Sequence, residues 1–201
     1  LIYEALGYDV PTFAHLSMIL GADGKKLSKR RNATSVEQYQ AMGYLPEALV
    51  NFLALLGWSL DGETTIIPTD VLCREFSLDR ITRKDAIFDE TKLDWMNGEY
   101  IKAMGASAWV NAVAPFLIDA GLTTQEKIEA NRDWYEKLYP LVAERMKRLT
   151  EAPEKLAFIF DGPNVTLDEK SVQKNLLKEG CRADEVLQKV RDILADESIA
   201  W

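Results

Sequence analysis

Residues 43–57 read GYLPEALVNFLALLG, and this stretch decides the fold class that we expect. Gly43 suits the position just past the end of one helix, because glycine adopts left-handed backbone angles at low cost. Pro46 suits the first turn of the next helix, where its missing N–H is not needed. The apolar run that follows stops at Gly57, well short of the roughly 18 apolar residues that span a bilayer. It therefore predicts a buried helix rather than a membrane segment.

Similar signals recur along the chain and predict a mainly α protein. Ser or Thr followed three positions later by Glu or Gln favours a helix start, and the pattern occurs as Thr34 with Glu37, Ser35 with Gln38, Thr123 with Glu126 and Thr166 with Glu169. With the spacing of apolar residues, these signals predict helices over about 34–43, 46–57, 69–76, 89–97, 107–120, 166–180 and 184–195, and further helix starts at Pro140 and Pro153. One short strand is expected within residues 12–20, before a turn at residues 21–24.

The pattern changes near Gly105, where we expect a boundary between two parts. Helices are short and interrupted before this point, whereas residues 105–201 read as helix after helix. A run of that kind predicts a helical bundle or a right-handed helical cage.

The overall charge gives no support for nucleic-acid binding. The net charge is −8, with 11 basic against 15 acidic residues in positions 1–104 and 13 against 17 in positions 105–201. Any such binding must therefore use local patches. The densest patch is residues 25–31, where five of seven residues are basic.

Metal binding by this segment is not expected. Cys73, Cys181 and His15 complete the inventory of soft ligands, and a structural zinc site needs three or four close together. Two distant cysteines without a secretory signal predict reduced thiols in the cytoplasm, and no contact with a membrane is expected.

The basic patch begins with a turn and can carry chemistry. Gly24 frees the backbone to reverse, Leu27 offers an apolar anchor, and several cations surround it. Such a loop can swing over a polyphosphate, because lysine ammonium groups neutralise charge that develops on a leaving pyrophosphate. A solvated basic turn, or a short contact with RNA backbone, explains the same residues and by spacing alone is the more common case.

The surroundings of the patch favour the first interpretation. Lys26-Leu27-Ser28-Lys29-Arg30 resembles the KMSKS signature of class I aminoacyl-tRNA synthetases. The flanking segments resemble the bacterial glutamyl branch, at residues 13–20, 23–26, 35–36, 43–49, 51–59, 88–89, 92–93 and 95–97, together with Tyr39. One departure is Arg31-Asn32-Ala33, where many bacterial members have His-Gly-Ala, and it leaves the subgroup open.

The resemblance implies an enzyme that activates glutamate with ATP and Mg²⁺ and transfers it to the 3′ end of tRNA(Glu). Lys26, Ser28 and Lys29 would be the catalytic residues of the loop, with Lys29 contacting ATP and Lys26 stabilising the pyrophosphate side. The resemblance divides the chain into the end of a nucleotide-binding catalytic domain (1–20), a stem-contact domain with the loop (21–104) and an α-helical anticodon-binding region (105–201), truncated at its end. Glutamate and ATP pockets would lie in the upstream catalytic domain, so this C-terminal fragment alone is expected to be an inactive monomer.

Candidate RNA contacts lie outside the loop. Arg80, Arg83 and Lys84 fall in a loop-like stretch that could meet the inner corner of tRNA. Arg145 and Arg148 are expected three residues apart on one helix, where they could meet the anticodon arm. Glu144 and Glu151 beside them favour a salt-bridged surface instead. His15 and the five tryptophans are more simply explained by packing than by catalysis or base stacking.

Three rival functions are considered for the same sequence. A paralogue that glutamylates a modified tRNA base lacks the helical anticodon-binding region. A glutaminyl enzyme would have β-barrels in its place, and the strand signal is weak. A non-catalytic helical module that binds tRNA or protein is the alternative from a different class.

Overall fold

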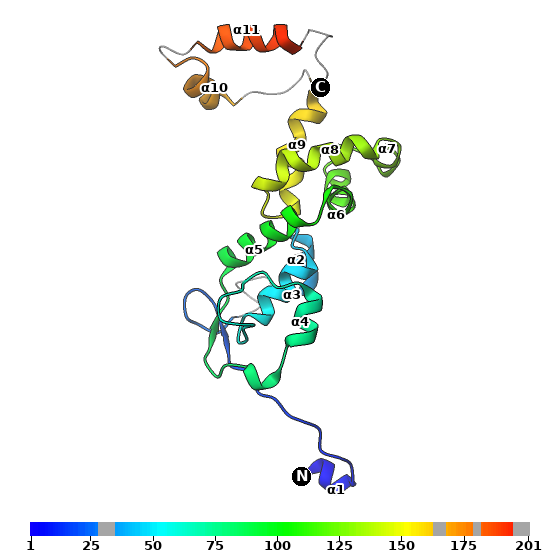
Figure 1. Ribbon diagram of the computed structural model, residues 1–201, viewed down its shortest axis with the longest axis vertical. Coiled ribbons are helices and arrows are strands. Elements are labelled where there is room, and N and C mark those ends of the chain that lie inside the picture. The colour runs from blue at the N-terminus through cyan, green and yellow to red at the C-terminus, as the bar shows by residue number, and fades with distance from the viewer. Residues whose placement is uncertain (28–34, 163–167, 179–181, 195–201) are drawn as a thin grey trace. The chain divides into compact units, whose positions relative to one another are not determined.

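The computed structural model of the chain describes residues 1–27, 35–162, 168–178 and 182–194. It forms two compact units, Leu1–Ala157 and Phe158–Trp201, each of which is described by itself. Apart from two strands of two residues each, the regular elements in the described part are helices (Figure 1). The expected mainly α fold is therefore confirmed.

The first unit holds most of the elements. In chain order they are α1 (Ile2–Leu6), β1 (Ile19–Leu20), α2 (Val36–Ala41), α3 (Pro46–Ala54), α4 (Thr69–Glu75), η1 (Leu78–Arg80), β2 (Ala86–Ile87), α5 (Glu90–Ala103), α6 (Ala106–Asp119), α7 (Gln125–Ala130), α8 (Arg132–Val142), η2 (Ala143–Arg145), η3 (Leu149–Glu151) and α9 (Ala152–Asp161). The last of these continues into the second unit, which also contains α10 (Glu169–Asn175) and α11 (Ala183–Leu194).

Besides a smaller cluster of Trp58, Ile67 and Leu72, two hydrophobic cores stabilise the first unit. One joins α2, α3 and α5 around Tyr39, Phe52 and Phe88, and the ring centroids of the two phenylalanines lie 4.9 Å apart. The other joins α6 and α8 around fully buried Trp109 and Leu117. Helix α5 joins the first core to the helices that follow it, because α5 packs on α3 at one side and on η2 at the other (Figure 1).

Helix starts were predicted better than helix ends. Ser35 and Gln38 form the expected capping box of α2, with the Ser35 amide donating to the Gln38 side chain at 3.2 Å. Thr124 rather than Thr123 caps α7, and Asp168 caps α10, whereas Thr166 lies outside the described residues.

Several expected boundaries were wrong. Helix α3 ends at Ala54, before Gly57, and the strand expected within residues 12–20 shrinks to β1, because only Ile19 and Leu20 pair with β2 in the described part. Pro140 does not start a helix but lies inside α8, which ends at Val142 soon after the proline removes a backbone donor.

Gly98 was predicted to follow a helix end, but α5 continues through it to Ala103. A Cβ at Gly98 would lie 3.2 Å from the carbonyl oxygen of Met146. The glycine therefore provides room for a neighbouring backbone segment, and the signal in the sequence was a packing signal rather than a stop signal.

Gly43 makes an even closer approach. Its φ is +83°, and a Cβ there would lie 2.6 Å from the amide nitrogen of Thr150 and 2.7 Å from that of Leu149. No side chain fits at this distance, so residues 149–150 can rest on Gly43 only because it has none.

We expect Gly43→Ala to lower the free energy of unfolding by about 2–4 kcal/mol, because left-handed strain and a backbone clash add together. Gly121→Ala is the matched control, since Gly121 also follows a helix with φ +72° but has nothing within 4 Å of an added Cβ. It should cost only about 1 kcal/mol. Urea titrations of both variants measure the difference, and equal losses would show that the close approach carries no energy.

Candidate functional site

Residues 19–27 form a tight reversal that leads into the basic loop. The Gly21 amide donates to the Lys25 carbonyl at 2.8 Å, and the Gly24 amide donates to the Gly21 carbonyl at 2.9 Å. Gly24 has a φ of +70°, which a residue with a side chain would rarely adopt. The Leu27 amide then donates back to the Ile19 carbonyl at 3.1 Å, so the chain returns beside β1.

The base of the basic loop is attached to the core on both sides. The Leu27 side chain packs against the cluster of Tyr39, Phe52 and Phe88, while the Lys26 side chain is exposed. On the far side, the Ser35 capping box starts α2. Three residues of the motif, Ser28, Lys29 and Arg30, lie outside the described residues.

The stretch with Arg80, Arg83 and Lys84 is a surface loop held at several points. Arg80 places its guanidinium 5.2 Å above the centre of the Trp58 ring and donates to the Leu60 carbonyl. Arg83 and Lys84 are exposed. The loop is attached where the Thr82 amide donates to the Gly57 carbonyl at 2.7 Å. Two cations on a fixed backbone are therefore available to an anionic partner.

Residues 42–45 and 147–151 meet on α5, and Asn97 is the centre of this contact. Its fully buried amide accepts a hydrogen bond from the Leu45 amide at 2.8 Å and donates to the carbonyls of Lys147 at 2.6 Å and Gly43 at 3.3 Å. The Leu149 amide also donates to the Gly43 carbonyl at 3.0 Å. The Asn97 side chain thus forms hydrogen bonds with backbone groups of two segments, one about fifty residues before it and one about fifty residues after it.

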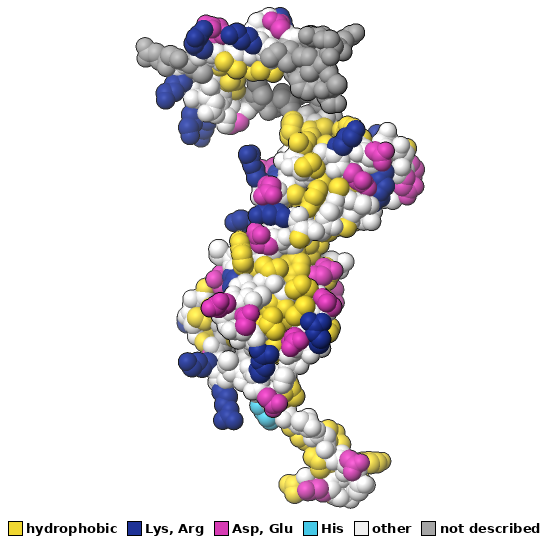
Figure 2. Space-filling view, in the orientation of Figure 1, with side chains coloured by type: hydrophobic (Ala, Val, Ile, Leu, Met, Phe, Trp, Pro, Cys, Tyr) yellow, Lys and Arg dark blue, Asp and Glu magenta, His cyan; other side chains and the backbone are white. Residues whose placement is uncertain are grey.

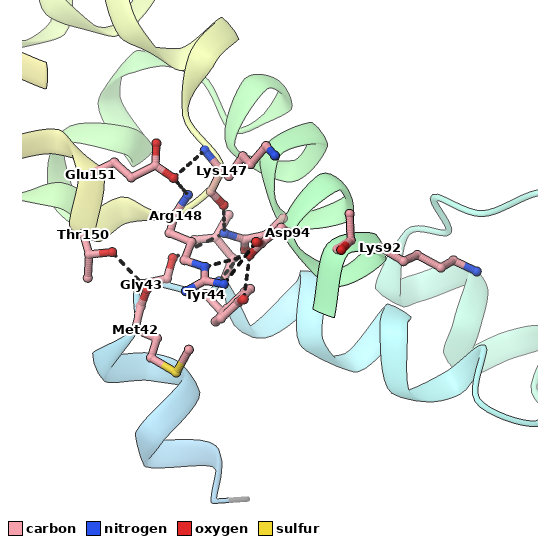
Figure 3. A network of polar contacts seen from close by, with 12 residues as sticks. Met42, Gly43, Tyr44, Lys92, Asp94, Lys147, Arg148, Thr150 and Glu151 are labelled. Atoms are coloured by element: carbon pink, nitrogen blue, oxygen red, sulfur yellow. Dashed lines mark hydrogen bonds and ion pairs between the residues drawn. The ribbon is translucent and has the colours of Figure 1, made fainter. Parts of the chain in front are cut away.

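A half-buried ion pair lies beside Asn97. The Arg148 guanidinium donates to both carboxylate oxygens of Asp94, at 2.7 and 3.0 Å, and Figure 3 shows the two side chains pointing toward one another. The Tyr44 hydroxyl donates to the same carboxylate at 2.6 Å, and the guanidinium lies 4.9 Å from the centre of the Tyr44 ring. Lys92, also on α5, points away from this network (Figure 3).

The charges of this group stabilise one another. Burial alone would raise the pKa of Asp94, but hydrogen bonds from Arg148 and Tyr44 and the Arg148 charge hold that pKa below the usual range of a carboxyl. The pKa of Tyr44 is raised by burial and by its hydrogen bond to Asp94. The hydrogen bond that Arg148 donates to Asp94 raises the pKa of Arg148 in turn. The group is therefore a carboxylate, a neutral phenol and a guanidinium at neutral pH.

The prediction that Arg145 and Arg148 share a helix was wrong. Arg145 ends η2, Met146 is extended, and Arg148 precedes η3. The chain leaves the helical path there because residues 146–150 rest on Gly43 and Gly98. Arg148 pairs with Asp94 rather than with Glu144 or Glu151, whereas Arg145 is exposed. Contact of either residue with RNA stays a prediction.

The tryptophans and His15 differ in how far they are buried. Trp58 and Trp109 are buried as expected, but Trp95 and Trp134 are 46% and 42% exposed, and Trp201 lies outside the described residues. His15 is exposed, so packing does not explain it.

The sequence singled out Tyr44 and Asn97 only as parts of segments that resemble the glutamyl branch, and it did not single out Asp94. Apart from Gly98, the local patterns gave no signal that these residues share one contact. A glycine inside a helical pattern can mark a close packing contact as well as a helix end.

Basic and acidic side chains are interspersed on the face shown in Figure 2. Among the described residues, no group of three or more His, Cys, Asp or Glu side chains is placed to hold a metal ion. No helix in the same residues is long and apolar enough to cross a bilayer.

Comparison with known protein families gives two matches in succession. Residues 1–95 match the family model described as tRNA synthetases class I (E and Q), catalytic domain. Residues 108–201 match the family model described as anticodon binding domain. The two matches fall on either side of the second half of α5.

Individual relatives agree with both matches. The chain is 44% identical over 173 residues to a glutamate–tRNA ligase of Natranaerobius thermophilus, covering 86% of this chain and 35% of the relative. It is 45% identical over 196 residues to a glutamate–tRNA ligase of Carboxydothermus hydrogenoformans, covering 98% and 40%. The crystal structure of a glutamate tRNA ligase from Elizabethkingia meningosepticum is similar with a TM-score of 0.72 at 29% identity, covering 97% of this chain and 40% of that one. The chain thus spans well under half the length of these relatives.

The ion pair predicts a specific loss of stability in acid. Because the pKa of Asp94 is lower in the folded state than in the unfolded state, its contribution is present above the unfolded pKa and is lost as pH falls through the folded pKa. The difference in free energy of unfolding between wild type and Asp94→Asn should therefore be constant above about pH 5 and shrink below about pH 4.

Denaturant titrations of both proteins across this pH range measure that difference. Asp119→Asn, at an exposed position on α6, is the control for removal of a carboxylate outside this network. A difference for Asp94→Asn that stays the same from pH 7 to pH 3 would contradict the role assigned to the carboxylate.

Proposed function

The chain belongs to the class I tRNA synthetases of the glutamate and glutamine type, and from this membership we propose that the whole protein is a glutamate–tRNA ligase. It activates glutamate with ATP and Mg²⁺ and transfers it to the 3′ end of tRNA(Glu) in the cytoplasm. The observation that carries the proposal is the joint match of both parts of the chain to relatives of that name. This chain supplies the loop and the tRNA-binding surfaces, and the remainder of the protein supplies the glutamate and ATP pockets.

The loop acts on the first chemical step. The glutamate carboxylate attacks the α-phosphorus of ATP, and pyrophosphate leaves with its added negative charge. Lys29 contacts the ATP phosphates and Lys26 stabilises the pyrophosphate side, while Ser28 donates a hydrogen bond or holds the loop shape and Arg30 adds positive charge. The anchoring of Leu27 in the core supports this role, because charge placement needs a fixed starting point for the loop.

The rival functions are disfavoured by particular findings. A base-modifying paralogue lacks an anticodon-binding region, yet residues 108–201 match one. A β-barrel anticodon region is disfavoured because the regular elements in the described part of residues 105–201 are helical. A non-catalytic module is disfavoured by the match of residues 1–95 to a catalytic domain.

Two surfaces are proposed for the RNA. Arg80, Arg83 and Lys84 meet the inner corner of the tRNA, and all three are exposed on an attached loop, although Arg80 also stacks on Trp58. Arg145 and Arg148 lie within the anticodon-binding part, at the end of η2 and just before η3. Arg145 is exposed and free to reach a phosphate, whereas Arg148 already holds Asp94.

Replacement of Lys29 tests the loop. In the full-length protein, Lys29→Ala should reduce ATP–pyrophosphate exchange by about a hundredfold or more, because a preplaced charge is lost at the leaving group. Binding of tRNA(Glu), measured by filter retention, should stay within about twofold, because the lysine acts on ATP and on few phosphates of the RNA.

Lys25→Ala is the matched control, since it removes a neighbouring exposed cation outside the motif. Its exchange rate should be close to that of wild type. An unchanged exchange rate in Lys29→Ala would contradict the assigned role.

Replacement of Arg83 or Lys84 tests the proposed corner contact. Arg83→Gln and Lys84→Gln should each weaken tRNA(Glu) binding and reduce the slope of log affinity against log salt by about one, as expected for the loss of one phosphate contact. Lys137→Gln on α8 removes the same charge elsewhere and should leave the slope unchanged. Slopes equal to wild type in both loop variants would place the contact elsewhere.

A further inference from the structure

The first unit can be divided at Gly105 into a part before it and a part after it. Residues 42–45 and 146–151 form a second connection between these two parts. The first connection is covalent and passes from α5 through Met104 and Gly105 into α6. Gly105 has a φ of +81° and no heavy atom within 4 Å of an added Cβ, so little packing restrains it. A single covalent link of this kind allows the two parts to rotate about its backbone bonds. A second link at a different place prevents that rotation.

The two connections hold α5 at two places along its length. Near its end, the Tyr139 hydroxyl contacts the carbonyls of Ile101 and Lys102. One to two turns earlier, Asp94 and Asn97 hold residues 147–148. A helix held at two places has a defined orientation relative to the group that holds it. The structure therefore offers a mechanism for fixing α6–α8 relative to the part that carries the turn at residues 19–27.

Among the polar contacts that link residues 42–45, α5 and residues 147–151, the Arg148–Asp94 pair is the charged one (Figure 3). The backbone contacts at Gly43 require only the right chain path. Arg148 in addition needs a planar fork, because it uses two nitrogens on one carboxylate while its flat face covers the Tyr44 ring. A lysine would keep the charge and lose both features.

We propose that Arg148 is a positioning residue that acts through Asp94 to hold the two RNA-facing parts in the one orientation in which a single tRNA contacts both. This inference rests on the proposed function. A rigid ligand that contacts two surfaces gains affinity only when their geometry allows simultaneous engagement. Loss of the Arg148–Asp94 pair would lower the affinity for tRNA without removing any contact with phosphate.

The alternative for Arg148 is direct contact with a phosphate, and the two roles predict opposite results. If Arg148 acts through Asp94, then Asp94→Asn weakens binding although it removes a negative charge. If Arg148 contacts phosphate, then Asp94→Asn releases the guanidinium and binding is unchanged or tighter. Arg148→Lys separates the roles again, because it keeps the charge and loses the fork.

The experiment measures the affinity of the full-length protein for a tRNA(Glu) transcript across a salt series. We expect Asp94→Asn, Arg148→Lys and Arg148→Gln each to bind at least about fivefold more weakly, with an unchanged salt slope. The double variant Asp94→Asn/Arg148→Gln should be no weaker than either single variant, because both remove the same pair. Lys92→Gln, on the same helix but directed away from the network, is the charge control.

Folding is checked separately by circular dichroism and thermal unfolding. If Asp94→Asn or Arg148→Gln fails to fold, Tyr44→Phe keeps the ring and removes one hydrogen bond to Asp94, and it should give a smaller loss of affinity in the same direction. Wild-type affinity in Arg148→Lys, or tighter binding in Asp94→Asn, would overturn the positioning role. A wild-type protein that does not bind tRNA(Glu) at all would overturn the proposed function and the inference with it.

Discussion

The close contact of two backbone segments at Gly43 is the constraint on which the rest of the first unit depends. Residues 149–150 lie where a side chain on Gly43 would be, and the backbone groups so brought together must find partners because they are buried. Asn97 supplies three of those hydrogen bonds from one amide. Without a glycine at position 43, residues 149–150 could not pack in this way beside α5.

The same contact explains the unusual choices along α5. Gly98 is a poor helix former, and Asn97 is polar and fully buried, yet both lie in the middle of a helix of fourteen residues. Each is required by the segment on its surface, Gly98 for space and Asn97 for hydrogen bonds. Asp94, one turn earlier, carries its charge at the edge of the contact, where Arg148 and Tyr44 compensate its partial burial.

Much of the fold and part of the site could be predicted without coordinates. The capping pair Ser35 and Gln38 and the first-turn proline Pro46 located helix starts correctly, because capping acts within four residues of a helix end. Helix ends were less predictable. Gly98 was interpreted as the position after a helix end, and one helix start was also misplaced at Pro140, although packing against other elements carries both helices past these residues.

The sequence by itself determined the helical class, the family resemblance and the basic loop, whose residues from Ser28 to Arg30 lie outside the described part. These features depend on neighbours along the chain, and a capping pattern or a motif is complete within a few positions. The pairing of Arg148 with Asp94 and the buried contact shared by Gly43 and Asn97 depend instead on how distant segments pack. Those pairs are separated by 54 residues each, and no local pattern encodes which distant residue will occupy the space beside a helix.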